Sequence, residues 1–297
     1  MKILDLTDLD KSDIKYQMIS YPDGQRDFVV DTKIKIGIGG MMFIDITKEV
    51  IQIKSRLNNA EDLLMIICAT KALRNLKIKE IHLYTPYIMG LRSDRLFQEG
   101  GNRYVKDIIA PLLNAQNFES VTCIDPHSDV AENCINNLIK LSNKKILDWM
   151  DIEFKSNRSK LHPSKCIWIA PDAGASKKIH KLAESCNYKG DIITCSKDRD
   201  VNGKLTKTVI PMNKIHDTYK DIIIIDDICD GGATFINIAK EIKDKYFKNK
   251  IYLICTHGIF SKGFGELQQY FDGIYTTNSY KQLNPDTQDF VKQLNVF

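Results

Sequence analysis

The chain has 297 residues, of which 43% are hydrophobic and 27% are charged. These proportions are ordinary for a soluble globular protein with one large domain or two domains of about 150 residues each. The 42 basic and 38 acidic residues give a formal charge of +4 and are spread along the chain. Nucleic-acid binding needs a clustered basic face, so we expect no nucleic-acid partner.

The N-terminus and the apolar runs predict neither secretion nor a membrane anchor. Acidic residues interrupt the opening sequence MKILDLTDLDK, where a secretory signal needs an unbroken apolar stretch. Apolar runs such as Leu63–Cys68 fall far short of the roughly 20 residues that span a bilayer. Eight cysteines occur without a CxxC pair, which favours thiols in a reducing compartment. We therefore expect a cytoplasmic protein with no membrane partner.

In chain order, the first predicted elements lie in the N-terminal segment. Gln25–Thr32 and Lys33–Ile36 alternate in polarity between turn residues and predict a β-hairpin flap. Beyond the flap, short runs rich in Ile and Val alternate with amphipathic stretches. The predicted strands are Glu80–Tyr84, Ser120–Ile124, Cys166–Ala170, Asp191–Cys195, Asp221–Ile225 and Ile251–Thr256. The predicted helices are Asn59–Leu76, Arg103–Asn114, Ala175–Asn187 and Ala233–Lys248.

The alternation of strands and helices defines the expected fold class. The strands are continuously apolar, as central strands of a parallel sheet covered on both faces are. The sequence therefore predicts an α/β protein with parallel sheets. A polar stretch, Asp151–Ser164, separates the two halves and predicts a boundary between domains 1–150 and 151–297.

The strongest functional signal is the segment Asp221–Thr234, which reads DIIIIDDICDGGAT. Its isoleucines predict a buried strand, and Asp226 and Asp227 follow where open α/β sheets bind ligands. The small residues after them predict a tight loop whose N–H groups converge on an anion at the next helix start. A polar strand end with a Gly-rich turn is the plainer alternative. The loop comprises Asp230, Gly231, Gly232, Ala233 and Thr234.

This loop resembles the ribose-phosphate loop of the phosphoribosyltransferase-type fold. Further segments resemble the ribose-phosphate diphosphokinases, or PRPP synthetases, in the same order along the chain. They are Arg56–Asn59 (RLNN), Pro86–Arg95 (PYIMGLRSDR), Asp125–His127 (DPH), Pro171–Gly174 (PDAG), Lys197–Arg199 (KDR) and Thr256–Ser261 (THGIFS). The resemblance implies two tandem phosphoribosyltransferase-type domains, an ATP side in the first and the ribose-phosphate loop in the second. In this reading Asp226 and Asp227 hold the ribose hydroxyls.

The resemblance implies an ATP site in the first domain. Arg92, Asp94 and Arg95 occupy the place of the family's ATP-contacting segment. Without the resemblance, a surface ion-pair cluster is the better interpretation of these three residues. Asp23 and Gln25 lie in the turn YPDGQ, which resembles a family turn that contacts adenine in a neighbouring subunit.

The resemblance also implies Mg²⁺ as cofactor, with ATP as co-substrate. His127 follows a predicted strand, where a lone His is more often structural, but the family match places it near Mg–ATP. Asp172 precedes a turn that opens a helix, so it is a helix N-cap, a Mg²⁺ or ribose ligand, or both.

Lys197 and Arg199 are the predicted catalytic residues. They lie one residue apart just after a predicted strand, and side chains at such positions of an extended chain point the same way. Phosphoryl transfer needs positive charge on the transferring group, and a loop that carries both residues could close over the triphosphate. A solvated loop is the alternative that the residues alone would favour.

The sequence departs from the family pattern at several positions. The family loop has a Thr after its third Asp, and here that position is Gly231, so one hydroxyl donor is lost and space is gained. Ser93 replaces a Gln, Gln25 replaces a Glu, and the chain ends at LNVF where the family usually adds a helix. The acceptor, the nucleotide preference and the assembly are therefore left open.

Two acceptors fit these observations. Ribose 5-phosphate would give PRPP and AMP, and it is the commoner substrate. ADP-ribose would suit the roomier loop and would resemble the ADP-ribose pyrophosphate synthetases of phage NAD-restoring pathways. The abundance of Lys, Ile and Asn is typical of an AT-rich genome, such as that of some phages, in which case the protein would act in the host cytoplasm.

Two further functions remain as rivals. A phosphoribosyltransferase would consume the diphosphate and needs only one domain. The ATP-type segments argue against this function. A regulatory relative without activity commonly loses the loop cations, both of which are retained here. Because relatives assemble as dimers or hexamers, the resemblance implies a homo-oligomer.

Overall fold

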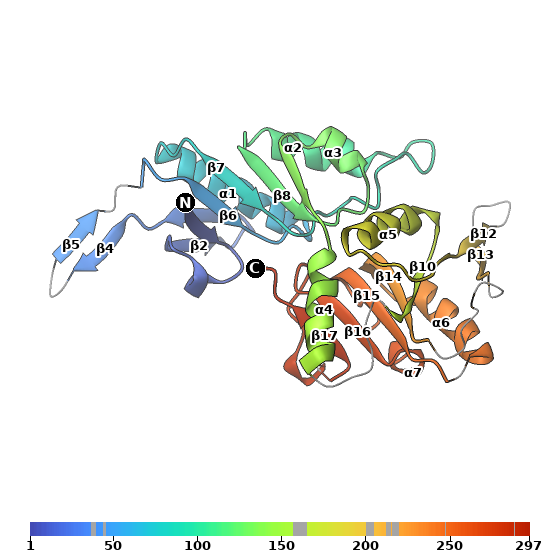
Figure 1. Cartoon of the computed structure of the whole chain (residues 1–297). Coiled ribbons are helices and arrows are strands. Elements are labelled where there is room, and N and C mark those ends of the chain that lie inside the picture. Colours follow the sequence, from blue (N-terminus) through green and yellow to red (C-terminus); the bar gives the residue numbers. More distant parts are fainter. Residues whose placement is uncertain are drawn as a thin grey trace. The chain divides into compact units, whose positions relative to one another are not determined.

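The computed structural model describes residues 1–36, 40–43, 46–156, 165–199, 205–211, 215, 220–246, 248–287 and 289–297. The chain divides into two compact units, Met1–Leu141 and Ser142–Phe297 (Figure 1). The boundary expected after residue 150 falls within helix α4 (Lys144–Ser156). The first residues of the polar stretch Asp151–Ser164 therefore belong to a helix, and its remainder lies outside the described residues.

The first unit is built on a parallel sheet. Five strands lie in the order β1-β6-β7-β8-β9, and every neighbouring pair is parallel. The predicted strands at β7 and β8 are confirmed, whereas β1, β6 and β9 were not predicted. The strand bounds are β1 Lys2–Asp5, β6 Ile51–Lys54, β7 Ile81–Tyr84, β8 Ser120–Ile124 and β9 Leu138–Leu141.

The helices of the first unit follow the predicted pattern with one difference. Helix α1 (Ala60–Asn75) begins after Asn59, whose side chain accepts a hydrogen bond from the N–H of Asp62 at 2.9 Å. The helix predicted over Arg103–Asn114 is instead a π-helix at Val105–Ile109 that continues into α2 (Ala110–Asn114). Two shorter elements, the 3-10 helix η1 (Leu9–Lys11) and α3 (Val130–Cys134), complete the set.

The N-terminal flap consists of two hairpins. Strand β2 (Tyr16–Ser20) pairs antiparallel with β3 (Arg26–Val30), and β4 (Lys33–Ile36) pairs antiparallel with β5 (Gly40–Phe43). The predicted segments Gln25–Thr32 and Lys33–Ile36 are therefore strands of different hairpins. Figure 1 shows the two ribbons in blue. The prediction of a hairpin flap holds, but the pairing of its segments differs, because Tyr21–Gln25 already closes a turn after β2.

The second unit is built on a parallel sheet of six strands. Their order is β11-β10-β14-β15-β16-β17, with every neighbouring pair parallel. A separate antiparallel ribbon joins β12 (Ser196–Arg199) to β13 (Leu205–Val209). The sheet strands are β10 Ile167–Ala170, β11 Ile192–Thr194, β14 Ile222–Cys229, β15 Ile251–Gly258, β16 Gly273–Thr277 and β17 Val291–Leu294.

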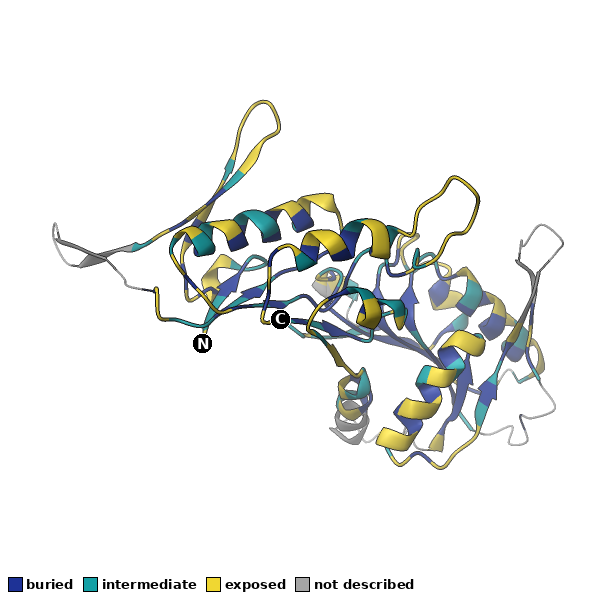
Figure 2. Ribbon diagram, turned by 90° about the horizontal axis from the view of Figure 1, so that it is seen from above, coloured by how far each residue is buried: buried dark blue, intermediate teal, exposed yellow. Residues whose placement is uncertain are grey.

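Helices cover both faces of this sheet, as continuously apolar strands require. Ile222 and Ile224 belong to the core cluster that includes α6, whereas Ile223 and Ile225 belong to the cluster that includes α4 and α5. In Figure 2 the strands are mostly dark blue, and the helices are dark blue on one side and yellow on the other. Each buried Ile contributes about 1.5–3 kcal/mol through the hydrophobic effect. The remaining bounds are α5 Ala173–Ser185, α6 Ala233–Lys245, α7 Leu267–Tyr270 and η5 Pro285–Thr287.

Among the helices that the structure describes, none combines the length and the apolar character that a bilayer crossing needs.

Candidate active site

The predicted ribose-phosphate residues of the second unit gather at one edge of its sheet. Asp172 follows β10, Asp226 and Asp227 lie toward the end of β14, and the loop after Cys229 leads into α6. Because all six strands are parallel, their carboxyl ends share this edge, which is where open α/β sheets bind ligands.

Strand β14 is longer than the sequence predicted. It was expected to end at Ile225, but it extends to Cys229 and contains both acids, with Asp226 paired in register with Cys255 and Ile228 with His257. Pairing with the long strand β15 stabilises this extension. Successive side chains of a strand point to opposite faces, so the two acids lie in different surroundings.

Asp227 is buried and forms an ion pair with a lysine from helix α5. Its exposed fraction is 4%, and its Oδ2 accepts a hydrogen bond from Nζ of Lys178. Because burying an unpaired carboxylate is costly, the lysine stabilises the charge of Asp227. Lys178 was missed in the sequence analysis, since nothing local relates it to an acid on a distant strand.

Asp226 is half-buried, and its carboxyl is hard to ionise. Burial raises the pKa of Asp226 well above its ordinary value, and the neighbouring charges of Asp227 and Asp172 raise it further. The N–H of Asp227, which donates to Oδ1 of Asp226 at 2.9 Å, and the ammonium of Lys178 act in the opposite direction. The two neighbouring carboxyl groups therefore affect the pKa of Asp226 more than the ammonium of Lys178 does, which favours a dication or hydroxyl donors at this edge.

The loop from Asp230 to Thr234 has the form of an anion cradle. Gly232 adopts φ 81°, a left-handed conformation that favours glycine, and a Cβ atom built on it would lie 3.1 Å from Cδ2 of Leu267. No side chain caps the start of α6, so its first N–H groups are open to an anion. In the part of the chain that the structure describes, the Thr234 hydroxyl forms no hydrogen bond.

The segment after β15 is attached to this loop by backbone hydrogen bonds. The N–H groups of Ile259 and Phe260 donate to the carbonyl oxygen of Cys229 at 2.9 and 3.1 Å, and that of Ser261 donates to Asp230 at 3.2 Å. His257 is 1% exposed and its Nδ1 lies 2.8 Å from Oγ of Ser279. The THGIFS segment therefore supports the loop, and His257 is a buried structural residue.

Cys229 does not carry a reactive thiolate. Although it precedes a helix start, a hydrogen bond with Cys255 and its burial raise the pKa of the Cys229 thiol well above its ordinary value. A completely buried, protonated thiol fills space, as the residues had indicated.

Asp172 is the N-cap of helix α5. Its Oδ1 accepts a hydrogen bond from the N–H of Ala175 at 2.9 Å. A Cβ atom on Gly174 would lie 3.2 Å from the same oxygen. The capping role that the sequence left open is therefore present, and the predicted ligand role stays a prediction.

Lys197 and Arg199 lie on the β12–β13 ribbon, of which the structure describes the backbone at these positions. Lys197 pairs with Thr208 and Asp198 with Lys207, and the register shifts between Asp198 and Arg199. Lys197 and Arg199 were predicted to point the same way because side chains alternate along a strand. The register shift interrupts that alternation. Their catalytic role stays a prediction.

In the first unit, two predicted ATP segments meet at the carboxyl edge of the sheet. Asp94, in the loop after β7, accepts a hydrogen bond at Oδ2 from Oγ of Ser128, which follows His127 after β8, at 2.5 Å. Asp125 adopts φ 43°, an uncommon conformation for a residue other than glycine, and turns the chain there. His127 is exposed at this edge. Ser128 was missed in the sequence analysis.

The remaining predicted ATP residues lie on loops. Arg92 is exposed, and the guanidinium of Arg95 lies 5.5 Å from the ring centroid of Phe97. Asp23 and Gln25 form the turn between β2 and β3, where Oδ1 of Asp23 accepts from the N–H of Gln25 at 3.0 Å. Within the described residues, no hydrogen bond or ion pair joins these two residues to the loops after β7 and β8.

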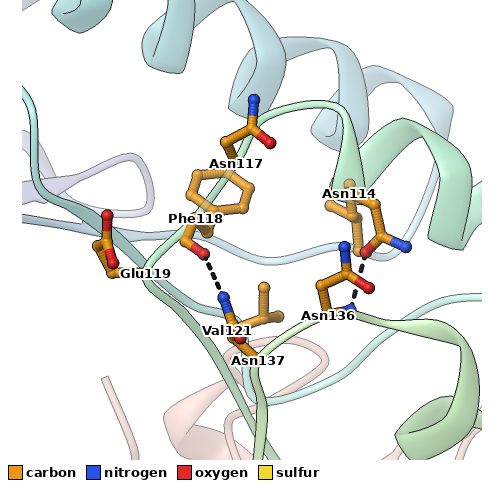
Figure 3. A pocket seen from close by; sticks show the side chains of 8 residues that line it. Asn114, Asn117, Phe118, Glu119, Val121, Asn136 and Asn137 are labelled. Atoms are coloured by element: carbon orange, nitrogen blue, oxygen red, sulfur yellow. Dashed lines mark hydrogen bonds between the residues drawn. The ribbon is translucent and has the colours of Figure 1, made fainter.

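A small polar pocket lies at the other edge of the first sheet (Figure 3). It has a volume of about 190 Å³ and is lined by turn residues that precede β8 and β9, among them Asn114, Asn136 and Asn137. Their amides already bond neighbouring backbone: Nδ2 of Asn137 donates to Phe118 at 3.0 Å, and Oδ1 of Asn114 accepts from Asn136 at 2.9 Å. None of the predicted site residues lines it.

Comparisons with known proteins find relatives of one kind. A family model described as the phosphoribosyl synthetase-associated domain matches residues 173–281. A ribose-phosphate pyrophosphokinase of Mycoplasmopsis pulmonis is 28% identical over 224 residues, covering 75% of this chain and 65% of that protein. One of Sulfurisphaera tokodaii is 28% identical over 199 residues, covering 67% and 63%.

The fold as a whole matches a solved structure. The phosphoribosylpyrophosphate synthetase from Mycobacterium smegmatis gives a TM-score of 0.76 at 14% identity, covering all of this chain and 95% of that one. Both units are thus α/β folds of the phosphoribosyltransferase type. The chain is similar to the ribose-phosphate pyrophosphokinases, also called the ribose-phosphate diphosphokinases. The matches span 65%, 63% and 60% of the length of three of these curated relatives.

Proposed function

We propose that the chain is an ATP-dependent diphosphotransferase whose acceptor is ribose 5-phosphate. The anomeric hydroxyl of the acceptor attacks the β-phosphorus of ATP in line, and the bond from that phosphorus to the α-phosphate oxygen breaks. AMP leaves with that oxygen, the hydroxyl loses its proton, and PRPP forms. Two observations support the proposal: the order of the motifs along the chain, and the curated relatives named ribose-phosphate pyrophosphokinase.

The observation that carries the proposal is the edge of the second sheet. Carboxyl groups at the ends of β10 and β14 can accept hydrogen bonds from ribose hydroxyls, and the uncapped start of α6 can bind the phosphate. We assign the hydroxyls to Asp226 and Asp227 and the 5-phosphate to the loop from Asp230 to Thr234. A vicinal diol with a phosphate is the ligand that this combination fits.

The residues of the first unit complete the proposed reaction. Arg92, Asp94, Arg95 and His127 would bind ATP. Lys197 and Arg199, from the second unit, would stabilise the negative charge of the transferring group, which is the main task of a protein in phosphoryl transfer. In this proposal the N-terminal domain is the ATP side and the C-terminal domain is the acceptor side.

Mg²⁺ is part of the proposal, and the charges at the carboxyl ends of the strands in the second sheet fit it. Within the described residues, no group of three or more His, Cys, Asp or Glu side chains is arranged to hold a metal ion. Mg²⁺, however, is usually bound through one or two carboxylates together with substrate phosphates. The proposed ligands are Asp172 of the second unit, whose charge helps to raise the pKa of the Asp226 carboxyl, and His127 of the first unit. The ion would neutralise charge on the triphosphate.

The test is an acceptor-dependent assay of AMP release. The purified chain is incubated with Mg²⁺ and ATP, with and without ribose 5-phosphate, and both AMP and PRPP are measured. We expect equal amounts of the two products and none without acceptor. Pyrophosphate release from PRPP and a base, without any nucleoside triphosphate, would instead identify a phosphoribosyltransferase. Silence with every acceptor would leave only a regulatory relative.

ADP-ribose is a second candidate acceptor, favoured by one observation. Gly231 contributes no side chain to the phosphate loop, so an acceptor whose 5-phosphate carries a further group meets less obstruction there. The product would be ADP-ribose 1-pyrophosphate, consistent with a role in NAD restoration in a phage. The same assay with ADP-ribose in place of ribose 5-phosphate decides between the two acceptors.

We also propose a homo-oligomer, dimer or hexamer, that acts in the cytoplasm. The turn at Asp23 and Gln25 projects beyond β2 and β3 and carries only its own turn hydrogen bonds among the described residues. A turn of this kind suits the contact with a neighbouring subunit that its sequence resembles. Sedimentation velocity of the full chain measures the number of subunits.

A further inference from the structure

Beside the phosphate loop lies a lysine that follows directly on the THGIFS segment. Lys262 is exposed. A Cβ atom built on Gly231 would lie 3.4 Å from both Cδ and Cε of Lys262 and 3.6 Å from its Cγ. The aliphatic chain of Lys262 therefore runs along the loop backbone at Gly231.

The position of Lys262 is fixed by the backbone on both sides. Before it, the N–H of Ser261 donates to the carbonyl oxygen of Asp230 at 3.2 Å, so the two loops are joined directly. After it, the N–H of Gly263 donates to Phe260 at 3.0 Å, and Gly263 adopts φ 68°. Lys262 thus lies inside a closed turn that is attached to the phosphate loop.

The ammonium group of Lys262 forms no ion pair in the part of the chain that the structure describes. The loop beneath it lacks a side chain at Gly231, and the start of α6 has no side-chain cap. A lysine ammonium is a flexible point charge that binds phosphate oxygens well.

We propose that Lys262 binds the 5-phosphoryl group of the acceptor and supplies the side-chain donor that Gly231 cannot. The inference rests on the proposed function, because it takes the loop from Asp230 to Thr234 as the phosphate site. It adds that one residue from the neighbouring loop determines the affinity for the acceptor. The shared ligand chemistry is a ribosyl 5-phosphoryl group, whether a monoester or part of a diphosphate.

The experiment compares Lys262→Ala and Lys262→Arg with a matched control, Lys240→Ala. Lys240 is an exposed lysine of α6. Initial rates of AMP release are measured with saturating Mg²⁺ and ATP while ribose 5-phosphate is varied. We expect KM for the acceptor to rise about tenfold or more in Lys262→Ala, the usual effect of losing a hydrogen bond to a charged group. The kcat and the KM for ATP should change little.

The conservative variant separates binding from a structural effect. Lys262→Arg keeps the charge and should retain an acceptor KM close to that of the wild type, and Lys240→Ala should match the wild type throughout. Equal acceptor KM values for Lys262→Ala and Lys240→Ala would overturn the inference. A fall in kcat with no change in acceptor KM would also overturn it.

The same titration with ADP-ribose identifies the source of the phosphoryl group. Whichever acceptor the wild type uses should be the one whose KM responds to Lys262→Ala. Calorimetric titration of ribose 5-phosphate without ATP separates the inference from the proposed reaction. Weaker binding by Lys262→Ala in a chain that releases no AMP would support the inference while the proposed function fails. Absence of binding to the wild-type chain, of either acceptor, would overturn both.

Discussion

Lys178 connects a helix to the buried carboxylate of Asp227, and its removal should be costly. Substituting Lys178→Met removes the ammonium group that pairs with Asp227, which is 4% exposed. The side chain of Lys178 is itself 32% exposed, so water screens part of the pair. We expect the free energy of unfolding to fall by about 2 kcal/mol, below the usual range for fully buried pairs.

Urea unfolding measures this loss, with Lys181→Met as the matched control. Lys181 is an exposed lysine of the same helix, α5. The control should change stability by no more than a few tenths of a kcal/mol, as surface substitutions usually do. Similar losses in the two variants would contradict the stabilising role of the ion pair.

Asp226 should make the ligand-free protein less stable as pH rises. Burial raises its pKa in the folded state, so between the ordinary value of 3.8 and the raised value the folded chain binds more protons than the unfolded chain. The free energy of unfolding therefore falls across that window, by about 1.4 kcal/mol for each unit by which the pKa is raised. Below pH 3.8 the effect is absent.

Asp226→Asn should remove this dependence. The variant should be more stable than the wild type at neutral pH and equally stable below pH 3.8, while AMP release falls because a proposed ribose ligand is lost. Asp244→Asn, at an exposed site of α6, is the control. Parallel stability curves for wild type and Asp226→Asn would show that Asp226 ionises normally.

At the scale of elements, the β12–β13 ribbon carries the predicted catalytic cations. Lys197→Ala should lower kcat by about 10²–10³, the usual effect of removing one group that stabilises transition-state charge. Lys207 lies on the neighbouring strand β13, where it pairs in register with Asp198, so Lys207→Ala serves as control. Single-turnover AMP release measures the effect, and an unchanged rate would remove Lys197 from the mechanism.

The sequence predicted the central strands well because their burial is continuous. The strands β7, β8, β10, β11, β14 and β15 were all found, since runs such as Ile222–Ile225 leave no other interpretation. Strands β1, β6 and β9 were missed because they are short and mix Lys with apolar residues, as in Leu138–Leu141. Strand β16 was missed although it is buried, because its threonine hydroxyls, such as that of Thr277, bond to backbone instead of water.

The candidate site was predictable where it depends on local sequence. A glycine turn before a helix, as at Gly232, and a cap such as Asp172 are visible in a single segment. The contacts that join segments were not: Lys178 with Asp227, Ser128 with Asp94, and Lys262 with Gly231 each link residues that are distant in the chain. The length of β14 was also missed, since only its partner strand explains why two acids remain in a strand.

At the scale of the whole molecule, each unit has its own hydrophobic core. One core cluster runs from Leu4 to Ile135, and the other two contain only residues of the second unit. Domains with separate cores generally fold alone. We expect the fragment Ser142–Phe297 to unfold cooperatively in urea and to bind ribose 5-phosphate, but to release no AMP from ATP.

Circular dichroism and calorimetry of the fragment test this expectation, with the full chain as the reference. Ribose 5-phosphate should bind the fragment and the full chain with similar affinity, since the proposed acceptor residues all belong to the second unit. A fragment that folds but fails to bind would show that the acceptor site needs the first unit.

The cysteine pair at the end of β14 has a practical consequence. Cys229 and Cys255 lie on neighbouring strands, completely buried, and the pKa of the Cys229 thiol is raised by their hydrogen bond and burial. Maleimides react with exposed thiolates, so these two thiols should escape modification. Cys68, Cys134 and Cys186 are half-buried, and because burial raises the pKa of the Cys68 thiol, Cys134 and Cys186 should react first. A fluorescent dye can therefore be attached to either unit of the natural chain without chemical damage to the ribose-phosphate loop.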